Sequence, residues 1–398
     1  MAKIEVRNLS KIFGKRTKPA LEMLKEKKSK DEILKETGLT VGVNRATFDV
    51  NEAEVFVIMG LSGSGKSTLV RLLNRLIDPT EGQIQIDGDD LAKMDDSALR
   101  EVRRKKMSMV FQKFGLFPFR TIVSNVEYGL EVQGMPKEER RQKALESLKL
   151  VGLEGYEDQY PDQLSGGMQQ RVGLARALAN DPDVLLMDEA FSALDPLIRK
   201  DMQDELLDLQ ASMQKTIIFI THDLDEALRI GDRIMIMKDG AIVQIGTPED
   251  ILMHPADDYV ARFVEDVDRS KVYTAEHIMT RPETVNAEKD GPRVALQRMR
   301  DANISSVYVV NRSRELQGIV HAPDIADAVK REERDITPYL QNEVPTCSLD
   351  TPMHDLFEMT SSSTVPIAVT SESGKLEGIV IRSKILSALS GKEVNSVE

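Results

Sequence analysis

An apolar run, a glycine-rich turn and a helix-forming segment follow one another directly along the chain from residue 55. The run reads VFVIM, the turn reads GLSGSGKST, and the segment after it reads LVRLLNRLI. A short continuous apolar run fits a sheet strand that is covered on both faces. Together the three parts predict a strand that turns sharply into a helix, as in an α/β domain.

The same alternation of apolar runs and helical patterns extends from Val41 to about Phe263. It predicts one α/β domain over this part of the chain. The segment Glu5–Gly14 alternates roughly as a strand does and ends on a glycine. The clearest buried strands are expected at Val55–Met59, Val184–Met187, Thr216–Ile220 and Arg233–Met237.

A highly charged stretch, residues 15–38 and here called the insertion, follows the first expected strand. Its apolar residues form a partial helical stripe, and Gly38 fits a helix C-cap. The stripe consists of Ala20, Leu21, Leu24, Ile33 and Leu34.

After Val267 the sequence contains an internal repeat. The segment SSVYVVNRSRELQGIV is echoed by STVPIAVTSESGKLEGIV, with Gly318 and Gly378 in matching places. Each half also opens with a short helical pattern, at Val294–Met299 and Met353–Met359. A unit repeated twice predicts a pseudo-symmetric β-α-β pair that buries one shared core.

The composition limits the classes of partner. The chain has 398 residues, 53 of them basic and 66 acidic, with a net charge of −13. A protein whose main ligand is nucleic acid usually has a basic surplus, so we expect no nucleic-acid partner. Cys347 is the only cysteine, which excludes an internal disulfide and suits a reducing cytoplasm.

The turn at residues 60–68, here called the phosphate loop, fits the pattern G-x-x-x-x-G-K-[ST]. Its glycines let backbone N–H groups surround a β-phosphate, and the next helix adds its positive end. Lys66 is expected to bridge the β- and γ-phosphates of ATP, and the Ser67 hydroxyl to ligate Mg²⁺. The candidate nucleotide-binding residues of the loop are Gly60, Ser62, Gly63, Ser64, Gly65, Lys66, Ser67 and Thr68.

Two acids end the apolar run VLLMDE at residues 184–189. Asp188 is expected near the Mg²⁺, and Glu189 near the attacking water as general base or water orienter. Alone this pair is a weak signal, because strand ends often carry acids. Together with the phosphate loop it predicts hydrolysis of ATP.

The segment LSGGMQQRVGLARAL at residues 164–178 resembles the signature motif of ABC ATPases. The resemblance implies an ABC-type P-loop ATPase domain with an α-helical subdomain. In that family the signature serves the nucleotide bound by another subunit, so a second copy of this chain is the implied partner. The matching signature residues are Ser165, Gly166, Gly167 and Gln169.

The same resemblance assigns four further residues. Gln112 matches the glutamine that contacts Mg²⁺ and responds to the membrane partner, and Asp195 matches the residue that faces across the dimer. His222 matches the switch histidine that contacts the γ-phosphate, with a structural histidine as the alternative. Phe13 matches the aromatic that stacks on adenine, with plain packing as the alternative.

Longer segments resemble the ATPase subunits of glycine betaine/proline importers of the OpuA/ProV type. They are IFGKR, GLSGSGKSTLVRLLNRLIDPTEG, VRRKKMSMVFQKFGLFPFRT and MDEAFSALDPLIRKDMQDEL. The resemblance implies an osmoprotectant importer driven from the cytoplasmic face of the cell membrane. Its implied partners are integral membrane permease subunits with a substrate-binding domain. A soluble non-transport ABC ATPase and a nucleotide-sensing regulator remain the alternatives.

In that branch the ATPase carries two C-terminal CBS motifs, and the internal repeat matches this pattern. CBS pairs commonly bind adenine nucleotides, and in related bacterial osmolyte importers the ligand is cyclic di-AMP. Importers of this kind also respond to ionic strength, which suits basic residues such as Arg382 and Lys384 against an anionic lipid surface. A solvated face is the alternative for that pair.

The candidate ligand contacts of the CBS pair have plain core packing as their alternative. They are Ile304, Ser306, Val307, Thr364, Val365 and Ile381. The expected domains are an ATPase domain over residues 1–268, CBS motifs over 269–333 and 334–390, and a flexible tail over 391–398.

Overall fold

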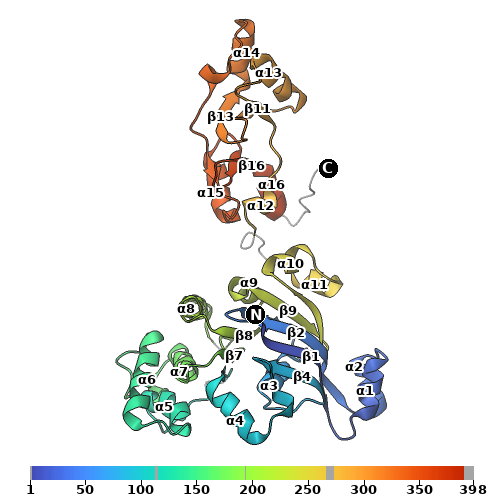
Figure 1. Cartoon of the computed structure of the whole chain (residues 1–398), viewed down its shortest axis with the longest axis vertical. Coiled ribbons are helices and arrows are strands. Elements are labelled where there is room, and N and C mark those ends of the chain that lie inside the picture. The colour runs from blue at the N-terminus through green and yellow to red at the C-terminus, as the bar shows by residue number, and fades with distance from the viewer. Residues whose placement is uncertain (1, 113–114, 193, 266–272, 390–398) are drawn as a thin grey trace. The chain divides into compact units, whose positions relative to one another are not determined.

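The chain divides into two compact units, Met1–Val264 and Glu265–Glu398. The computed structural model describes residues 2–112, 115–192, 194–265 and 273–389 (Figure 1). The expected boundary at residue 268 and the expected tail at 391–398 lie outside the described residues.

A six-stranded sheet in the order β10-β9-β3-β8-β7-β6 forms the centre of the first unit. All its neighbouring strands are parallel except β10, which runs antiparallel to β9. The four strands expected from apolar runs are confirmed as β3, β7, β8 and β9, and β3 and β7 are buried along their whole length. The strands are β3 (Val55–Met59), β6 (Met107–Val110), β7 (Val184–Asp188), β8 (Thr216–Thr221), β9 (Arg233–Lys238) and β10 (Ala241–Gly246).

A second, antiparallel sheet in the order β2-β1-β4-β5 packs against the first. Its strands are β1 (Ala2–Phe13), β2 (Thr40–Asn51), β4 (Glu81–Ile86) and β5 (Asp89–Asp90). The core between the sheets is apolar, and the rings of Phe48 on β2 and Phe56 on β3 stack with centroids 5.6 Å apart. This core positions the carboxyl end of β3, where the phosphate loop begins.

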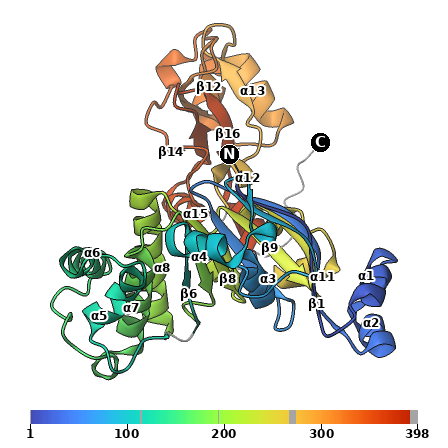
Figure 2. The same cartoon turned by 60° about the horizontal axis from the view of Figure 1, so that its bottom comes forward.

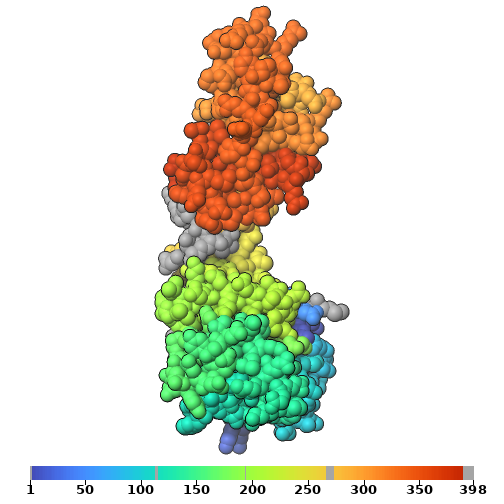
Figure 3. All heavy atoms as spheres, turned by 90° about the vertical axis from the view of Figure 1, so that its left-hand side faces the viewer, coloured from blue at the N-terminus to red at the C-terminus, as the bar shows by residue number. Residues whose placement is uncertain are grey.

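Helices surround the two sheets. In Figures 1 and 2, α5, α6 and α7 lie together on one side, and Figure 3 shows the face over which this helical segment (teal to green) spreads. The helices are α3 (Lys66–Leu73), α4 (Asp96–Lys105), α5 (Ile122–Val132), α6 (Lys137–Leu150), α7 (Gly166–Leu178), α8 (Pro196–Met213), α9 (Leu224–Ile230), α10 (Pro248–Met253) and α11 (Asp258–Phe263), with 3₁₀ turns at Leu91–Lys93 and Pro161–Gln163.

The insertion folds into two short helices, α1 (Lys18–Lys25) and α2 (Lys30–Thr37), on the side of the sheets away from α5–α7 (Figures 1 and 2). Its stripe is confirmed except at Leu34, which is 46% exposed. Neighbouring residues of a helix point about 100° apart around its axis, so Leu34 faces water while Ile33 is buried. Gly38 is confirmed as the C-cap of α2, with φ at 69°. The stripe packs against strand residues in a small cluster of Ile12, Ala20, Leu24, Ile33 and Val41.

The second unit contains two similar three-stranded sheets, one for each repeat. In both, a parallel pair of strands is followed by an antiparallel one. The first repeat has β11 (Thr284–Asn286), α13 (Pro292–Asp301), β12 (Ser306–Val310), β13 (Leu316–His321) and α14 (Ala322–Lys330). The second has β14 (Thr346–Cys347), α15 (Met353–Ser362), β15 (Ile367–Thr370), β16 (Leu376–Val380) and α16 (Arg382–Leu389), and α12 (Ala275–Ile278) and a 3₁₀ turn at Thr337–Tyr339 precede the two repeats.

Each repeat is completed by the segment that leads into the other. Thr280, ahead of the first repeat, exchanges two backbone hydrogen bonds of 2.9 Å with Ile379 on β16. Gln341, ahead of the second repeat, does the same with Ile319 on β13, at 2.9 and 3.0 Å. Neither repeat can therefore form its whole hydrogen-bonded sheet alone.

This exchange explains the matching glycines of the repeat. A Cβ on Gly318 would lie 2.3 Å from the Gln341 carbonyl oxygen, and one on Gly378 would lie 2.5 Å from the Met279 sulfur. Gly318 also has φ at 151°, which side chains other than glycine rarely adopt. Each glycine thus makes room for the leading segment of the other repeat.

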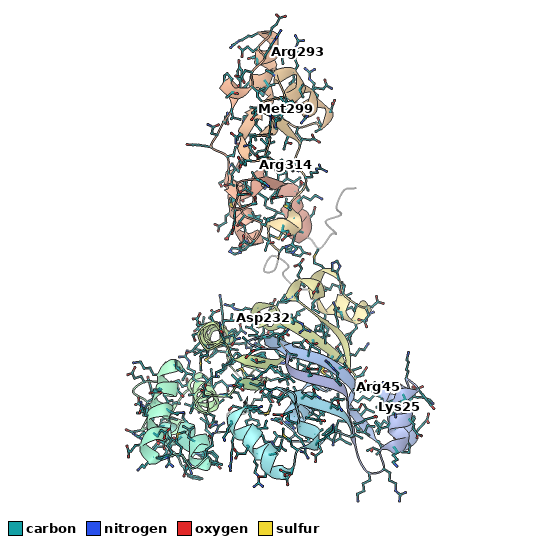
Figure 4. The ribbon with its side chains drawn as sticks, viewed as in Figure 1. Lys25, Arg45, Asp232, Arg293, Met299 and Arg314 are labelled. Carbon is teal, nitrogen blue, oxygen red and sulfur yellow. The ribbon has the colours of Figure 1, made fainter. Side chains whose placement is uncertain are left out.

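The repeats also share a core, as the sequence predicts. It contains Tyr308, Val310 and Ile319 from the first repeat with Ala368 and Leu376 from the second. The Tyr308 hydroxyl donates to the Pro366 carbonyl, and burial raises the pKa of Tyr308. Met299 on α13 lies in a separate core of the first repeat (Figure 4).

In the part of the chain that the structure describes, no helix combines the length and the apolar character needed to cross a bilayer.

The cluster under the insertion makes its stability testable. We expect Ile33→Ala to increase hydrogen–deuterium exchange across residues 15–38, because removing a buried isoleucine costs about 2–5 kcal/mol. Leu34→Ala is the matched control, since exposed substitutions usually change stability by less than about 0.5 kcal/mol. Equal protection of the insertion in both variants would contradict the packing described here.

Candidate functional site

A cavity of about 590 Å³ opens beside the phosphate loop, at the junction of β3 and α3. Seven of the predicted nucleotide-binding residues line it, together with Glu189 and His222. The lining residues are Phe13, Lys30, Thr40, Val41, Gly42, Leu61, Ser62, Gly63, Gly65, Lys66, Ser67, Thr68, Glu189 and His222.

Lys66 is a buried cation at the first position of α3, only 5% exposed. Its Nζ donates to the carbonyl oxygens of Gly60 at 2.7 Å and Leu61 at 3.3 Å. Burial lowers the pKa of Lys66, and the charges of Glu189 and Asp188 oppose this shift. Burial disfavours the charged form of this amino group. An anion bound in the loop would stabilise that charged form.

Ser67 and Asp188 meet at the mouth of the loop. The Ser67 hydroxyl donates to Asp188 Oδ1 at 3.0 Å, and Asp188 is buried at the end of β7. One hydroxyl and one carboxylate are the oxygen ligands that Mg²⁺ takes when substrate phosphates supply the rest. Among the described residues no group of three or more His, Cys, Asp or Glu side chains could hold a metal. Ser67 and Asp188 are therefore suited to hold Mg²⁺ together with the phosphates of a bound nucleotide.

Glu189 follows β7 directly and lies between two polar side chains. Gln112 Nε2 donates to Glu189 Oε2 at 3.0 Å, and His222 Nδ1 lies 3.8 Å from Glu189 Oε1. Gln112 Nε2 also lies 3.4 Å from Ser192 Oγ. The backbone of Glu189 has φ at 48°, an uncommon conformation that occurs often at active sites. The arrangement aims a carboxylate at the cavity with a histidine beside it.

Three predicted nucleotide-binding residues do not line the cavity. Gly60 contributes its carbonyl to Lys66, the Ser64 side chain is buried, and Gln112 reaches the site only through Glu189. Phe13 lies in the cavity wall and is 41% exposed as a residue, and Lys11 Nζ is 5.3 Å from the centroid of its ring.

Five lining residues are absent from the sequence prediction. They are Lys30, Thr40, Val41, Gly42 and Leu61. Phe13 on β1 pairs with Thr40 on β2, so the start of β2 lies beside the predicted adenine platform. The available signal for the β2 residues was weak: the strand after Gly38 follows β1 in sequence, and sequential strands lie side by side in about two-thirds of cases.

The signature residues lie elsewhere in the same unit. Ser165 caps α7 by accepting from the Met168 N–H at 3.3 Å, and Gly166 and Gly167 form the first turn. Gln169 donates to the carbonyls of Pro161 and Leu164 at 2.9 and 3.1 Å. None of the four predicted signature residues is among those that line the cavity. Asp195 caps α8, accepting from the Ile198 N–H at 3.1 Å.

An apolar groove of about 270 Å³ lies near Gln112. Phe111, Leu76 and Tyr128 are among its lining residues. Phe119, in the turn before α5, is 93% exposed. Leu76 and Phe111 are exposed apolar residues in the wall of the groove, and such a grouping is typical of a protein-binding surface.

The second unit has its own cavity of about 520 Å³, here called the repeat cleft. It contains two of the six predicted regulatory contacts, Thr364 and Val365. The lining residues are Ile319, His321, Gln341, Glu343, Val344, Pro345, Met359, Ser362, Ser363, Thr364 and Val365. His321 Nε2 lies 3.2 Å from Gln341 Oε1.

The other four predicted contacts lie outside the repeat cleft. Val307 is buried in the core of the first repeat, and Ser306 begins β12. Ile304 is exposed ahead of β12, and Ile381 precedes α16.

Comparison with known families and proteins covers nearly the whole chain. Residues 43–192 match the ABC transporter family, and residues 275–331 and 334–391 each match the CBS domain. The chain is 67% identical over 395 residues to the glycine betaine/carnitine transport ATP-binding protein GbuA of Listeria monocytogenes, covering 99% of both chains. It is 64% identical over 391 residues to the glycine betaine transport ATP-binding protein OpuAA of Bacillus subtilis, covering 98% of this chain and 93% of that one.

More distant relatives extend the same comparison. Identity is 49% over 397 residues to the glycine betaine/proline betaine transport system ATP-binding protein ProV of Escherichia coli, covering 99% of both chains. A solved dimeric bacterial ABC transporter cassette has a TM-score of 0.53 and 35% identity, covering 62% of this chain and 98% of that one. A dimeric post-hydrolysis cassette bound to ADP and phosphate has the same identity and coverage, with a TM-score of 0.52. The predicted fold class is confirmed: an ABC-type α/β ATPase domain followed by a tandem CBS domain.

The position of Glu189 makes its role testable. We expect Glu189→Gln to retain ATP binding, because the phosphate loop is unchanged, while ATP hydrolysis falls about 10²–10⁴-fold with the loss of the acid/base group. Steady-state phosphate release and equilibrium ATP binding on the purified chain measure the two effects. Glu52→Gln, at an exposed position in the turn before β3, is the control. Near-normal turnover in the Glu189 variant would rule out this role.

Proposed function

Because the chain belongs to the ATP-binding subunits of ABC transporters that carry a tandem CBS domain, we propose that it powers import of a compatible solute. The proposed solute is a quaternary amine such as glycine betaine or proline betaine, and the proposed place is the cytoplasmic face of the cell membrane. The observation that carries this proposal is identity along both units, at 67% over 99% of each chain, with a protein named for glycine betaine/carnitine transport. A soluble non-transport ATPase finds no support among the three relatives described above, since all are named for transport.

The residues of the cavity suit hydrolysis of ATP. Phe13 offers a ring face for adenine, and the phosphate loop offers N–H groups and the Lys66 cation for the phosphates. Ser67 and Asp188 would hold Mg²⁺ on the protein side, and the ion would supply positive charge that offsets the charge of the phosphates. Glu189 would orient and deprotonate the attacking water, and His222 would contact the γ-phosphate from beside it.

A second copy of the chain would complete each site. The signature residues at the start of α7 do not line the cavity of their own chain, although a helix N-terminus suits a γ-phosphate. In a head-to-tail dimer they would face the nucleotide of the other copy, with Asp195 at the contact between copies. The two dimeric cassettes that this fold resembles support that arrangement.

The groove near Gln112 is the proposed docking surface for the membrane permease subunits. Phe111 in the wall of the groove precedes Gln112, which donates to Glu189, so a partner seated here would lie beside the residue that contacts the proposed catalytic carboxylate. The apolar lining of the groove and the exposed Phe119 support a protein partner at this surface.

Reconstitution with the permease tests the transport proposal. In proteoliposomes that hold the co-purified complex, we expect glycine betaine to stimulate ATP hydrolysis and to accumulate in the ATP-dependent direction. Phe119→Asp should abolish the stimulation and leave ATP binding to the isolated chain unchanged, because it removes exposed apolar contact area outside the nucleotide cavity. Leu150→Asp, on α6 and 48% exposed, is the matched control. Failure of every quaternary amine and of proline to stimulate the complex would contradict the proposed solute class.

The tandem CBS domain is the proposed regulatory element, with an adenine nucleotide such as cyclic di-AMP as its ligand. The repeat cleft has a volume typical of small-molecule sites and offers His321, Gln341 and Thr364 as polar groups. Residues from both repeats line the cleft, so a ligand bound there would change the packing between the repeats.

Filling the repeat cleft tests this regulatory proposal. Calorimetric titration of the full chain with cyclic di-AMP and AMP should show binding of one of them, and Thr364→Tyr should abolish it by occupying the cavity. Ser373→Tyr, in an exposed turn between β15 and β16, is the control. In proteoliposomes the bound nucleotide should change ATP hydrolysis by the wild-type complex and leave the Thr364 variant unaffected. Absence of binding by either nucleotide would contradict the proposed ligand class.

A further inference from the structure

We propose that Lys30, in the charged insertion, is a second phosphate-binding cation of the nucleotide cavity. It would act on the α- and β-phosphates, which ATP and ADP share. This inference rests on the proposed nucleotide site and adds a residue that lies outside all of its motifs.

The position of Lys30 supports this role directly. Its side chain lines the same cavity as Phe13, Lys66 and Glu189. Its Nζ donates to the Gly63 carbonyl of the phosphate loop at 3.3 Å. The insertion therefore contacts the turn that would hold the phosphates, although the two are distant in sequence.

A lysine at position 30 does not contribute to the stability of helix α2 itself. It is the first residue of α2, where the positive end of the helix disfavours a cation. The helix is started instead by Ser29 and Glu32, whose side chains each accept from the other's backbone N–H. Alanine or glutamine at position 30 would leave this capping box intact.

Among the described residues, the charge of Lys30 also has no ionic partner. Lys28, two residues earlier, pairs with Glu36 at 3.4 Å. Across the described ranges of the chain, by contrast, no carboxylate lies within 4.0 Å of Lys30. The cavity thus contains an uncompensated cation at its rim in addition to the buried one on Lys66.

The contacts of Lys30 indicate which phosphates it would meet. The helix α2 runs from Lys30 to Thr37 and leads through Gly38 to Thr40, which pairs with Phe13, so its last turn lies beside the proposed adenine platform while Lys30 lies at its other end. Lys66 holds the carbonyls of Gly60 and Leu61, whereas Lys30 reaches Gly63. In Figure 4, Lys25 on α1 and Arg45 on β2 mark the insertion and the strand that follows it. The backbone of such a loop cradles the α- and β-phosphates, whereas its lysine reaches the β- and γ-phosphates. A cation at Gly63 would therefore act on the phosphates that ATP and ADP share.

Equilibrium binding tests the proposal on the full-length chain. The probes are ADP and the non-hydrolysable β,γ-imido analogue of ATP, each with Mg²⁺, and the variants are Lys30→Ala and Lys30→Arg. We expect Lys30→Ala to weaken both nucleotides alike, about three- to tenfold, because a partly exposed charge pair contributes modestly. Lys30→Arg should retain most of the affinity. Lys35→Ala, at an exposed position on the same helix and outside the cavity, is the matched control.

Salt dependence separates a charge effect from a structural one. The difference between wild type and Lys30→Ala should shrink between low salt and about 0.5 M salt, because screening acts on exposed charges. An equal difference at all salt concentrations, or an equal loss in Lys35→Ala, would overturn the proposal. So would unchanged ADP affinity in Lys30→Ala while Lys66→Ala loses binding, an outcome that leaves the proposed function intact. Failure of the wild-type chain to bind either nucleotide would instead refute the proposed function.

Discussion

The nucleotide site depends on one buried cation that the protein neutralises only in part. Lys66 lies at the start of α3 with its amino group turned onto two carbonyls of the loop, and burial lowers its pKa. The charges of Asp188 and Glu189 favour its protonated form, yet neither carboxylate forms an ion pair with it in the described part of the chain. Such a site is most stable when an anion enters it. The two-sheet core around β3 supplies the rigid support that holds this cation in place.

Much of the fold and the site could be predicted from sequence where the determinants are local. The phosphate loop, the acids after β7 and the four buried strands each follow from a few neighbouring residues, and their environments agree with the pattern. Leu34 was placed wrongly, because a helix as short as α2 buries only a narrow stripe. Lys30 could not be assigned, since its place depends on how the insertion packs against β1 and β2, which local periodicity does not report.

The second unit shows the same limit in another form. The repeat predicted two similar halves and a shared core, and both are present. The exchange of leading segments was not predictable, because it joins residues as far apart as Thr280 and Ile379. In the sequence, this exchange is indicated only by the matching glycines. The reason for a glycine at each position is visible only in the structure, where the leading segment of the other repeat passes beside it. Since each repeat completes the sheet of the other, we expect the proposed ligand of the repeat cleft to affect both repeats together.

We propose that the signature residues of a second copy complete each nucleotide cavity. Two single variants, Ser62→Cys in the phosphate loop and Ser165→Cys at the start of α7, test it when mixed in the Glu189→Gln background. The native Cys347 is buried, so a short thiol cross-linker should react mainly at the introduced residues. The account predicts a cross-linked dimer that carries both variants and forms only when ATP is present. Cross-linking that is absent with ATP, or that is equal with and without it, would contradict the account.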